Sequence, residues 1–312
     1  MSYYQQQNRR KLTIGQDGNA LTMLIAINLV AFVLLAFVRV IYYFSFGKVD
    51  GPALFDAQVL HWLTLPADMN SFIGRPWTLI THMFVHNPAN VWHIIGNMLW
   101  LWAFGYIFQD LTGYRKITPV YIFGGLAGAL AYVLAFNFIP GLKVYLEGAE
   151  ALGASAGVMA IAIATTTLAP NYRIFHMLNG GIPIWVITVI FLVIDLAMIP
   201  NDNPGGHIAH LAGGGMGFFF VMQMRRGRDI GAWINRFFDW TTNLFNPDKP
   251  AKGKSVKTQL FYKPNVQPYK KTPLVTQQKV DEILDKISQK GYSSLTEDER
   301  EVLKRASKED LI

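Results

Sequence analysis

Residues 207–217 read His-Ile-Ala-His-Leu-Ala-Gly-Gly-Gly-Met-Gly, and this is the most informative stretch of the chain. On an α-helix His210, Gly213 and Gly217 share one face, because residues three and four apart are neighbours on the helix surface. Small residues on such a face allow close helix packing in lipid, where no hydrophobic force drives helices together. The stretch therefore predicts a packed membrane helix that carries an imidazole beside a close-packing groove.

A second stretch of the same kind, Gly-Ala-Ser-Ala-Gly, occupies residues 153–157. Its small residues let another backbone approach Ser155, and its place near the start of a predicted helix exposes N–H donors beside the hydroxyl. Polar groups cost free energy inside a bilayer, so a lone hydroxyl and a lone imidazole in predicted spans indicate function. Each motif alone also fits plain helix packing, with His210 merely hydrogen-bonded between helices.

A third group of polar residues includes His93 and Asn97, which lie four residues apart. They project from one face of a helix and offer two side-chain donors to a single point. Donors held around a developing oxyanion are usually the largest catalytic contribution, about 3 kcal/mol for each one removed in a soluble serine protease. The simpler interpretation is that Asn97 hydrogen-bonds across the bundle and that His82 and His86 lie at the membrane interface. For His82 and His86 we favour this simpler interpretation.

Six apolar segments predict an all-α, polytopic membrane protein. The 312 residues are 51% hydrophobic and only 16% charged, whereas soluble domains usually carry about 25% charged residues. Crossing about 30 Å of hydrocarbon takes about 20 mostly apolar residues. The segments that fit are 20–44, 90–108, 117–139, 152–169, 182–200 and 207–224. Because the third is rich in Gly and Ala, we expect a packed six-helix bundle.

Basic residues set the expected orientation, since short loops rich in Lys and Arg stay cytoplasmic. Such residues occur in the N-terminal segment 1–19, between the second and third predicted spans, and after the last span. We expect a multi-pass protein of the cell membrane with both termini in the cytoplasm and a membrane domain at 20–226. Within it, residues 45–89 are too polar and too rich in Gly and Pro to span, which predicts an interfacial outer loop.

The remaining chain divides into a basic linker, 227–279, and a small soluble helical tail, 280–312. Residues 249–280 carry eight lysines and no acidic residue, within a chain of formal charge +7. Because the basic residues flank apolar runs, this charge favours anionic lipid headgroups over nucleic acid. In the tail, apolar residues at helical spacing and the capping pair Thr296 and Glu299 predict two short helices. A hairpin with a regulatory or docking role is expected.

The conjunction of three motifs resembles a known family. Ser155 in Gly-x-Ser, His210 in His-x-x-Gly-x-x-x-Gly, and His-x-x-x-Asn in the second span resemble the rhomboid intramembrane serine proteases. The resemblance covers approximately residues 70–225, and Trp77 with the segment 81–86 also looks like the family's entry into the second helix. The tail looks like an extension of some bacterial members.

This resemblance implies a role for each matching residue. Ser155 would be the nucleophile and His210 its general base, then the acid to the leaving amine, in a Ser-His dyad that needs no aspartate. The backbone N–H of Ser155, together with His93 and Asn97, would form the oxyanion hole. Gly153 would leave room for the scissile carbonyl. No cofactor or metal is expected.

Two departures and two polar neighbours affect the expected geometry. Members of the family commonly have Gly where this chain has Ala156, and an aromatic residue where it has Met159. We expect the site to tolerate the extra methyl group and Met159 to pack against the imidazole. His207 is the runner-up for the base, but only His210 sets the glycines at the family spacing. Asp195 could orient the base, although we favour an interfacial carboxylate at a helix end.

The expected partners are transmembrane proteins that serve as substrates. A membrane helix hides its peptide bonds, so hydrolysis needs a wet cavity that opens outward. Substrates with helix-weakening Gly or Pro and a small residue at the cut are expected, as the resemblance also implies. The sequence leaves the physiological substrate and the oligomeric state open.

Two alternatives belong to other classes. A non-catalytic rhomboid-like protein could bind membrane clients, although such a protein would be expected to lack the serine or the histidine. A zinc protein could use His82, His86, His207 and His210. That reading lacks a His-Glu-x-x-His motif and leaves Ser155 unexplained, and EDTA should leave proteolysis untouched. The chain has no cysteine, which excludes disulfides, thiolate metal sites and a Cys nucleophile.

Overall fold

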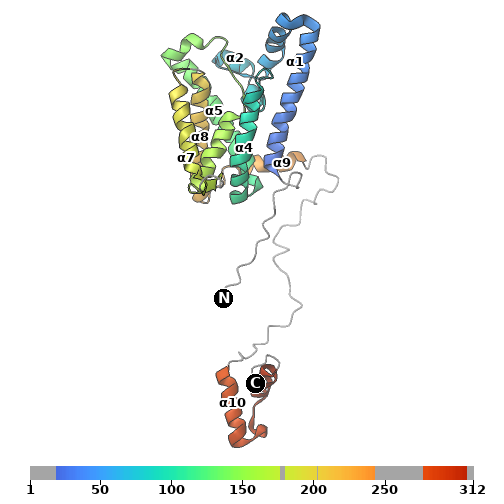
Figure 1. Cartoon of the computed structure of the whole chain (residues 1–312), viewed down its shortest axis with the longest axis vertical. Helices are drawn as coiled ribbons and strands as arrows, with labels where there is room; N and C mark the ends of the chain where they lie inside the picture. Colours follow the sequence, from blue (N-terminus) through green and yellow to red (C-terminus); the bar gives the residue numbers. More distant parts are fainter. Residues whose placement is uncertain (1–18, 176–179, 202, 243–276, 308–312) are drawn as a thin grey trace. The chain divides into compact units, whose positions relative to one another are not determined.

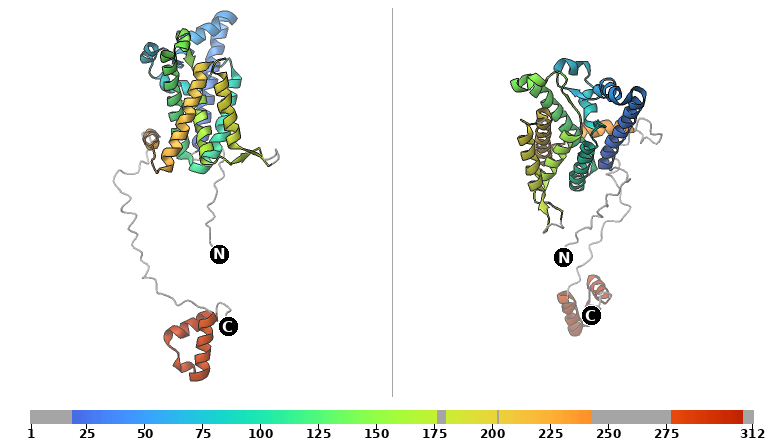
Figure 2. Two further views of the ribbon diagram at one scale, coloured as in Figure 1. Left: turned by 90° about the vertical axis from the view of Figure 1, so that its left-hand side faces the viewer. Right: turned by 45° about the horizontal axis from the view of Figure 1, so that its top comes forward.

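The computed structural model of the protein describes residues 19–175, 180–201, 203–242 and 277–307. The chain is divided into two compact units, Met1–Asn246 and Pro247–Ile312. Helices make up most of the described chain, and in the first unit they run side by side as a bundle (Figures 1 and 2). The all-α prediction is confirmed at this level.

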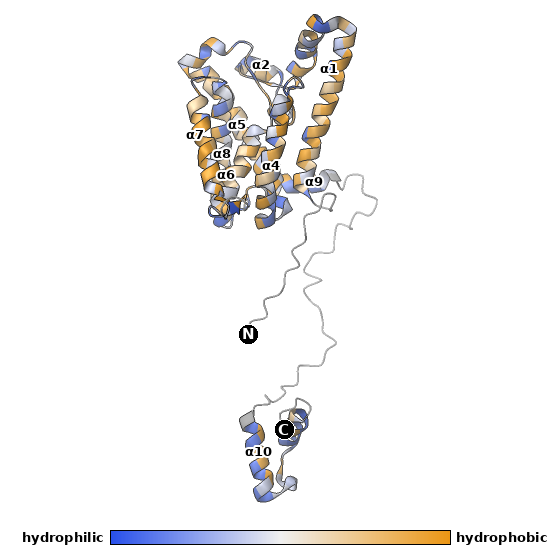
Figure 3. Ribbon diagram, in the orientation of Figure 1, coloured by the Kyte–Doolittle hydropathy of each residue, from blue (hydrophilic) through white to orange (hydrophobic). Residues whose placement is uncertain are grey.

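A helix lies at each of the six segments that the sequence predicts to span a membrane. They are α1 Ala20–Gln58, α4 Val91–Thr112, α5 Ile117–Phe138, α6 Ser155–Leu168, α7 Ile184–Met198 and α8 Pro204–Arg225. Within the described ranges, length and composition allow a membrane crossing at Ala20–Trp62, Val91–Thr112 and Tyr114–Phe138, while α6 and α7 are shorter apolar helices. Hydrophobic residues dominate α1 and α7 in Figure 3. The count of six spans stays a prediction.

Helix α1 is longer than the predicted segment 20–44 because it continues beyond a break. The break is at Gly47, whose φ of 83° suits glycine. The chain then folds back on itself, since a Cβ on Gly51 would lie 2.6 Å from the Tyr42 carbonyl oxygen. Phe55 is fully buried there, with its ring edge-on to Tyr42 at 6.1 Å. The first part of the predicted interfacial loop is therefore helical.

The rest of that loop consists of short elements tied to a later part of the chain. The elements are η1 Leu60–Trp62, β1 Leu65–Pro66, α2 Met69–Gly74, α3 Thr78–Thr81 and η2 His82–Phe84. Strand β1 pairs antiparallel with β2, Glu150–Ala151, so that Leu65 lies opposite Ala151. The Glu150 carboxylate contacts His61 at 2.5 Å and Arg75 at 3.4 Å. These contacts fix the loop to the segment that leads into α6.

Close packing of α6 against α5 and α8 forms the centre of the bundle. A Cβ on Gly217 would overlap the Ala160 carbonyl oxygen, and one on Gly213 would overlap that of Ala156. The groove predicted from residues 207–217 is confirmed, because these glycines allow α8 to touch the backbone of α6. The connections at the bundle ends are η3 Tyr114–Lys116, η4 Pro140–Tyr145, and the paired strands β3 Arg173–Ile174 and β4 Ile182–Pro183.

A further helix, α9 Ala232–Thr242, lies inside the region predicted as a basic linker. It is placed at the end of the bundle where α1 begins (Figure 1). Its Ile234 side chain is buried, and the Asn235 amide donates to the Arg115 carbonyl at 2.9 Å. The linker prediction is therefore wrong for these residues, whereas the lysine-rich stretch 249–276 lies outside the described chain.

The second unit is a small helical hairpin. It consists of α10 Gln277–Lys290, η6 Tyr292–Ser294 and α11 Glu297–Ala306. Thr296 caps α11, and its side chain and that of Glu299 form the reciprocal capping box, so the predicted helix start is confirmed. The buried apolar residues are Val280, Ile283, Leu295, Val302 and Ala306.

Candidate active site

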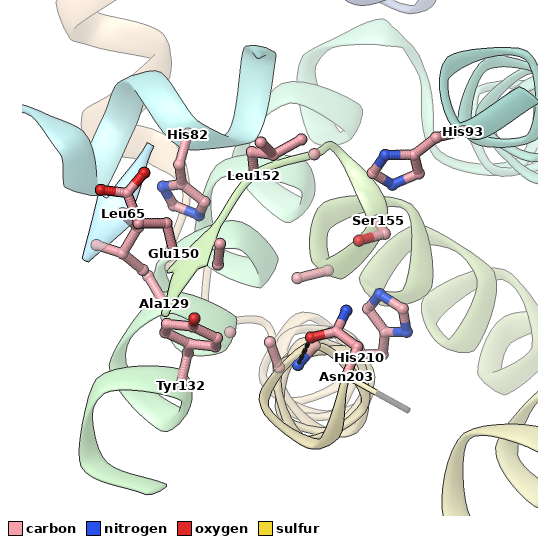
Figure 4. Close-up of a pocket in the computed structure, with 16 residues that line it drawn as sticks. Leu65, His82, His93, Ala129, Tyr132, Glu150, Leu152, Ser155, Asn203 and His210 are labelled. Carbon is pink, nitrogen blue, oxygen red and sulfur yellow. Dashed lines mark hydrogen bonds between the residues drawn. The ribbon is translucent and has the colours of Figure 1, made fainter. Parts of the chain in front are cut away.

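A cavity of about 270 Å³ gathers the predicted site residues from separate parts of the first unit. Ser155, Gly153, His93 and His210 all line it. In Figure 4, Ser155 lies between His93 and His210. The structure therefore brings together a hydroxyl from the start of α6 and imidazoles from α4 and α8.

Ser155 begins α6, and the segment before it needs a glycine. Gly153 has a φ of 121°, and a Cβ there would lie 2.9 Å from His93 Cε1 and 3.8 Å from Asn97 Nδ2. Its N–H donates to the His82 carbonyl at 2.9 Å. Gly153 thus makes room for the predicted oxyanion donors two residues before Ser155 in the chain.

His86 connects these donors to the serine segment, a role that sequence reasoning missed. It is fully buried, and its Nε2 accepts from Asn97 Nδ2 at 3.1 Å and from the Ala154 N–H at 3.5 Å. Burial lowers the pKa of His86 to about 3, and the nearby His93 adds to this effect. The ring is therefore neutral, with an acceptor nitrogen at Nε2.

His82 and His86 are buried within the first unit, and their location at the membrane interface stays a prediction. His82 is 5% exposed, its ring donates from Nδ1 to the Thr78 carbonyl at 2.7 Å, and it lines the cavity. Burial lowers the pKa of His82 to about 4. Both histidines hold the loop and the donors in place. No periodic pattern in the sequence indicates this role, because residues 81–90 form short irregular elements.

Asn97 and His93 take different positions in this arrangement. His93 lines the cavity, whereas the Asn97 side chain is 8% exposed and directs an amide N–H to His86. An amide carries two N–H bonds, so one remains for another acceptor. The predicted common face of the two residues is confirmed by their joint approach to Gly153.

His210 is bonded to Asp195 of α7. The Asp195 Oδ1 accepts from His210 Nδ1 at 2.9 Å and from His207 Nδ1 at 2.6 Å. Asp195 is 5% exposed and lies in the last turn of α7, and its location at the membrane interface stays a prediction. With the proton on Nδ1, Nε2 of His210 is left as the basic nitrogen. Among the described contacts no hydrogen bond joins Ser155 to His210, and this contact stays a prediction.

The two departures from the family pattern are accommodated by packing. Ala156 occupies space that glycine provides, because a Cβ on Gly128 would lie 2.6 Å from the Ala156 methyl. Met159 is buried, and its Cγ would lie 3.2 Å from a Cβ on Gly214. Met159 thus packs against α8 beyond His210, and it is not among the residues that line the cavity.

The four histidines of the zinc alternative do not come together in the structure. Within the described ranges, the group whose donor types fit a metal ion is Asp195, His207 and His210, with ligand atoms within 4.8 Å of one another. His82 and His86 instead bond to Thr78 and to Asn97. In the group of Asp195, His207 and His210, each imidazole hydrogen-bonds to the Asp195 carboxylate.

Comparisons with known proteins cover the same region. Residues 74–227 match the model of the rhomboid domain, and residues 268–309 match a family of unknown function (DUF6576). RHOMBOID-like protein 12, mitochondrial, of Arabidopsis thaliana is 27% identical over 165 residues, which cover 50% of this chain and 48% of that protein. RHOMBOID-like protein 5 of the same plant is 24% identical over 155 residues, or 49% of this chain and 47% of that protein. The chain spans about half the length of these curated relatives.

Proposed function

This chain belongs to the rhomboid family through residues 74–227, and from that membership we propose that it is an intramembrane serine endopeptidase. One observation carries the proposal: Ser155, His93 and His210 line one cavity although they come from three different helices. A serine, a base and an oxyanion donor around one cavity constitute the minimal machinery for acyl transfer.

The proposed reaction proceeds through an acyl-enzyme. Ser155 Oγ attacks the scissile carbonyl carbon while His210 Nε2 takes the hydroxyl proton. The C–N bond then breaks, and the imidazolium returns this proton to the leaving amine. Water, activated by the same nitrogen, releases the acyl group. The Ser155 N–H, His93 and Asn97 donate to the oxyanion, whose stabilisation is typically the largest single contribution.

We extend the proposal to the membrane setting. Six spans from α1, α4, α5, α6, α7 and α8 would hold the site below the outer surface, with both termini in the cytoplasm. The substrates would be transmembrane proteins, because the cavity gives water and an unwound peptide access to the serine. Three helices long and apolar enough to cross a bilayer support this placement.

Reconstitution of the full chain with a model transmembrane substrate tests the proposal. Ser155→Ala and His210→Ala should lower cleavage to background, a loss of about 10⁶ in a soluble serine protease. His207→Ala should retain substantial cleavage, and EDTA should not alter that of the wild type. Thermal unfolding of each variant controls for folding.

Full activity in Ser155→Ala would contradict the serine mechanism. Loss in His207→Ala with retention in His210→Ala would exchange the base. An inactive wild type that still binds the substrate would favour the non-catalytic alternative, in which the chain binds membrane clients.

A further inference from the structure

Asp195 is a buried carboxylate and the one charged residue of α7. It lies in α7, three residues before the last one, Met198, and is 5% exposed. A buried carboxylate is costly unless it is paired. Its recorded partners are the two imidazoles of α8, which share one helical face because His207 and His210 are three residues apart.

We propose that Asp195 is a positioning residue for His210, which gives the site a Ser155–His210–Asp195 triad in place of the dyad that the resemblance implied. This inference rests on the proposed protease function. The bond from His210 Nδ1 to Asp195 fixes the ring orientation and the tautomer, and it leaves Nε2 for the proton of Ser155. The carboxylate also stabilises the imidazolium that forms when Nε2 takes this proton.

His207 has a different task from His210. Both bond to the same carboxylate oxygen, but His210 lines the cavity and His207 is not among the lining residues. Their rings are nearly perpendicular, at 85° with centroids 5.7 Å apart. His207 therefore contacts the carboxylate without lining the cavity, and it satisfies part of the acceptor capacity of a buried charge.

The same three groups have donor types that suit a zinc ion, so the test must separate the two possibilities. The recorded distances of 2.6 and 2.9 Å from Oδ1 to the two Nδ1 atoms are those of hydrogen bonds. These two hydrogen bonds join two N–H donors to one acceptor oxygen, and they explain why the three side chains lie together without an ion.

The experiment uses the full chain in liposomes with a fluorophosphonate probe and a model transmembrane substrate. The probe reports on the serine directly: Ser155 Oγ forms a bond to phosphorus, fluoride leaves, and the hydroxyl proton passes to His210. Asp195→Asn keeps an acceptor oxygen but removes the charge, whereas Asp195→Leu removes both at similar volume. Asp110→Asn, at the exposed end of α4, is the matched control.

We expect the labelling rate and kcat to fall at least about tenfold in Asp195→Asn and further in Asp195→Leu, with KM within about twofold. In a soluble serine protease the analogous Asn substitution lowers kcat by about 10⁴. Asp110→Asn should match the wild type, and His207→Gln should lose less than about fivefold. The thermal midpoint of Asp195→Asn should stay close to that of the wild type, because hydrogen bonds to the amide oxygen remain.

Wild-type labelling rates in both Asp195 variants would overturn the inference and leave the protease function standing. Loss of both kcat and thermal stability in Asp195→Asn would assign the residue to folding alone. A change in wild-type labelling after EDTA, reversed by zinc, would replace the triad with a metal site. A wild type that neither reacts with the probe nor cleaves would instead refute the proposed function.

A second observation, independent of the site, concerns α9. Trp233, Phe237 and Trp240 follow each other at spacings of four and three, so they share one helical face, and they are 52%, 54% and 59% exposed. The helix is held to the bundle from its other side, where Ile234 is buried and the Asp239 carboxylate pairs with Arg115 at 3.2 Å. Phe237 and Trp240 are thus directed away from the protein, whereas the Trp233 ring also contacts Phe123 of α5 edge-on, with ring centroids 6.1 Å apart.

We infer that this face inserts between the lipid headgroups and the acyl chains, in the leaflet of the bilayer that lies nearest the end of α8. Helix α9 begins seven residues after Arg225, the last residue of α8. The exposed side chains of Arg225, Arg226 and Arg228 lie at the end of α8 and in the segment that leads to α9. Trp residues concentrate at this depth of a bilayer, and arginines beside them favour anionic headgroups. An amphipathic helix with such a face lies in the plane of the interface.

The absence of cysteine from the chain makes this inference directly testable. Phe237→Cys and, as the matched control on the neighbouring face, Arg236→Cys are labelled with an environment-sensitive fluorophore in vesicles of neutral and anionic lipids. Quenchers attached to the lipids should reduce the signal at 237 at least about twofold more than at 236. Equal quenching would overturn the inference. Protection of 237 from both lipid and aqueous quenchers, together with cross-linking between chains, would show a protein interface instead.

Discussion

Helix α8 of the first unit and α11 of the second unit follow opposite rules for the residues that face inward. The inward positions of α8 are glycines, Gly213 and Gly217, which touch the backbone of α6. Those of α11 are Val302 and Ala306, which fill a small apolar core. The outward surfaces of the two units also differ. In the first unit, α7 exposes Val, Ile and Leu residues, whereas α11 of the second unit exposes charged residues.

The difference shows that the residue types on the inward face of a helix depend on the solvent around the protein. In water, burial of apolar surface stabilises a helix, so the inward face is identified by its hydrophobic residues. In lipid, both faces are apolar, and the inward face is identified by small residues and by the polar groups that lipid does not tolerate. Substitutions on the two helices should therefore have effects of different kinds.

The largest expected effect is that of Gly217→Val in α8. The added side chain would overlap the Ala160 carbonyl oxygen, a backbone atom that cannot move without separating α6 from α8. Overpacking of a core costs about 1–3 kcal/mol, and occasionally more. We expect at least the upper end of this range, seen as a lower thermal midpoint in detergent. Gly215→Val is the control, because a Cβ there meets nothing within 4 Å. Equal midpoints for the two variants would contradict the packing argument.

The next largest effect is that of Val302→Asp in α11. Val302 is 2% exposed, so the substitution buries a charge without a partner and should unfold the hairpin. Hydrogen exchange of the full chain should show loss of protection at 277–307 and unchanged protection in the first unit. Exposed Lys304, changed to Gln, should leave both units protected. Loss of protection in α8 as well would show that the two units do not unfold independently.

These effects follow from patterns that the sequence already contains, and this part of the fold was predictable. The spacing of Gly213 and Gly217 predicts the contact with α6, and Thr296 with Glu299 predicts the start of α11. The pattern of apolar segments also locates each long helix of the bundle to within a few residues, apart from the extension of α1 beyond Gly47.

The pairing of Asp195 with His210 was not predictable in the same way. The two residues lie on different helices, and the rotation of one helix about its axis relative to the other is not encoded in either segment alone. Helix α7 is apolar on all sides, so it carries no periodic signal that orients Asp195. The bond between His86 and Asn97 was missed for a related reason, because irregular loop elements place His86. Helix α9 was missed because the charge of its surroundings was interpreted as a linker.

A smaller effect is expected for Thr296→Ala, which removes the cap of α11. The Thr296 hydroxyl accepts the Glu299 N–H at 3.4 Å. Loss of such a cap costs about 1 kcal/mol. Hydrogen exchange should accelerate in the first turn of α11 and remain slow in α5 and α8. Thr296→Ser, which keeps the hydroxyl, should behave as the wild type. Unchanged exchange in the alanine variant would show that the cap does not limit the stability of the hairpin.

The smallest effect should be a dependence of the hairpin on pH. The hydrogen bond from Lys286, followed by the bond from the Thr296 backbone, lowers the pKa of Glu299 from 4.5 to about 2. A carboxyl group with a lower pKa in the folded state stabilises that state above its unfolded pKa, and this contribution disappears as the pH falls. Protection of α10 and α11 should therefore decrease between about pH 4.5 and 2. Glu299→Gln should remove this component, and an identical pH profile in the variant would contradict the assignment.

The pairing of β1 with β2 makes the loop between α1 and α4 mechanically continuous with the segment that leads into α6. Leu65 is in register with Ala151, and the Ala67 N–H donates to the Ala149 carbonyl at 2.9 Å. Ala151 is only four residues from Ser155. A force that shifts the loop is therefore transmitted through two hydrogen-bonded strands to Ser155 at the start of α6. The position of Ser155 in the cavity is thus tied to the position of this loop.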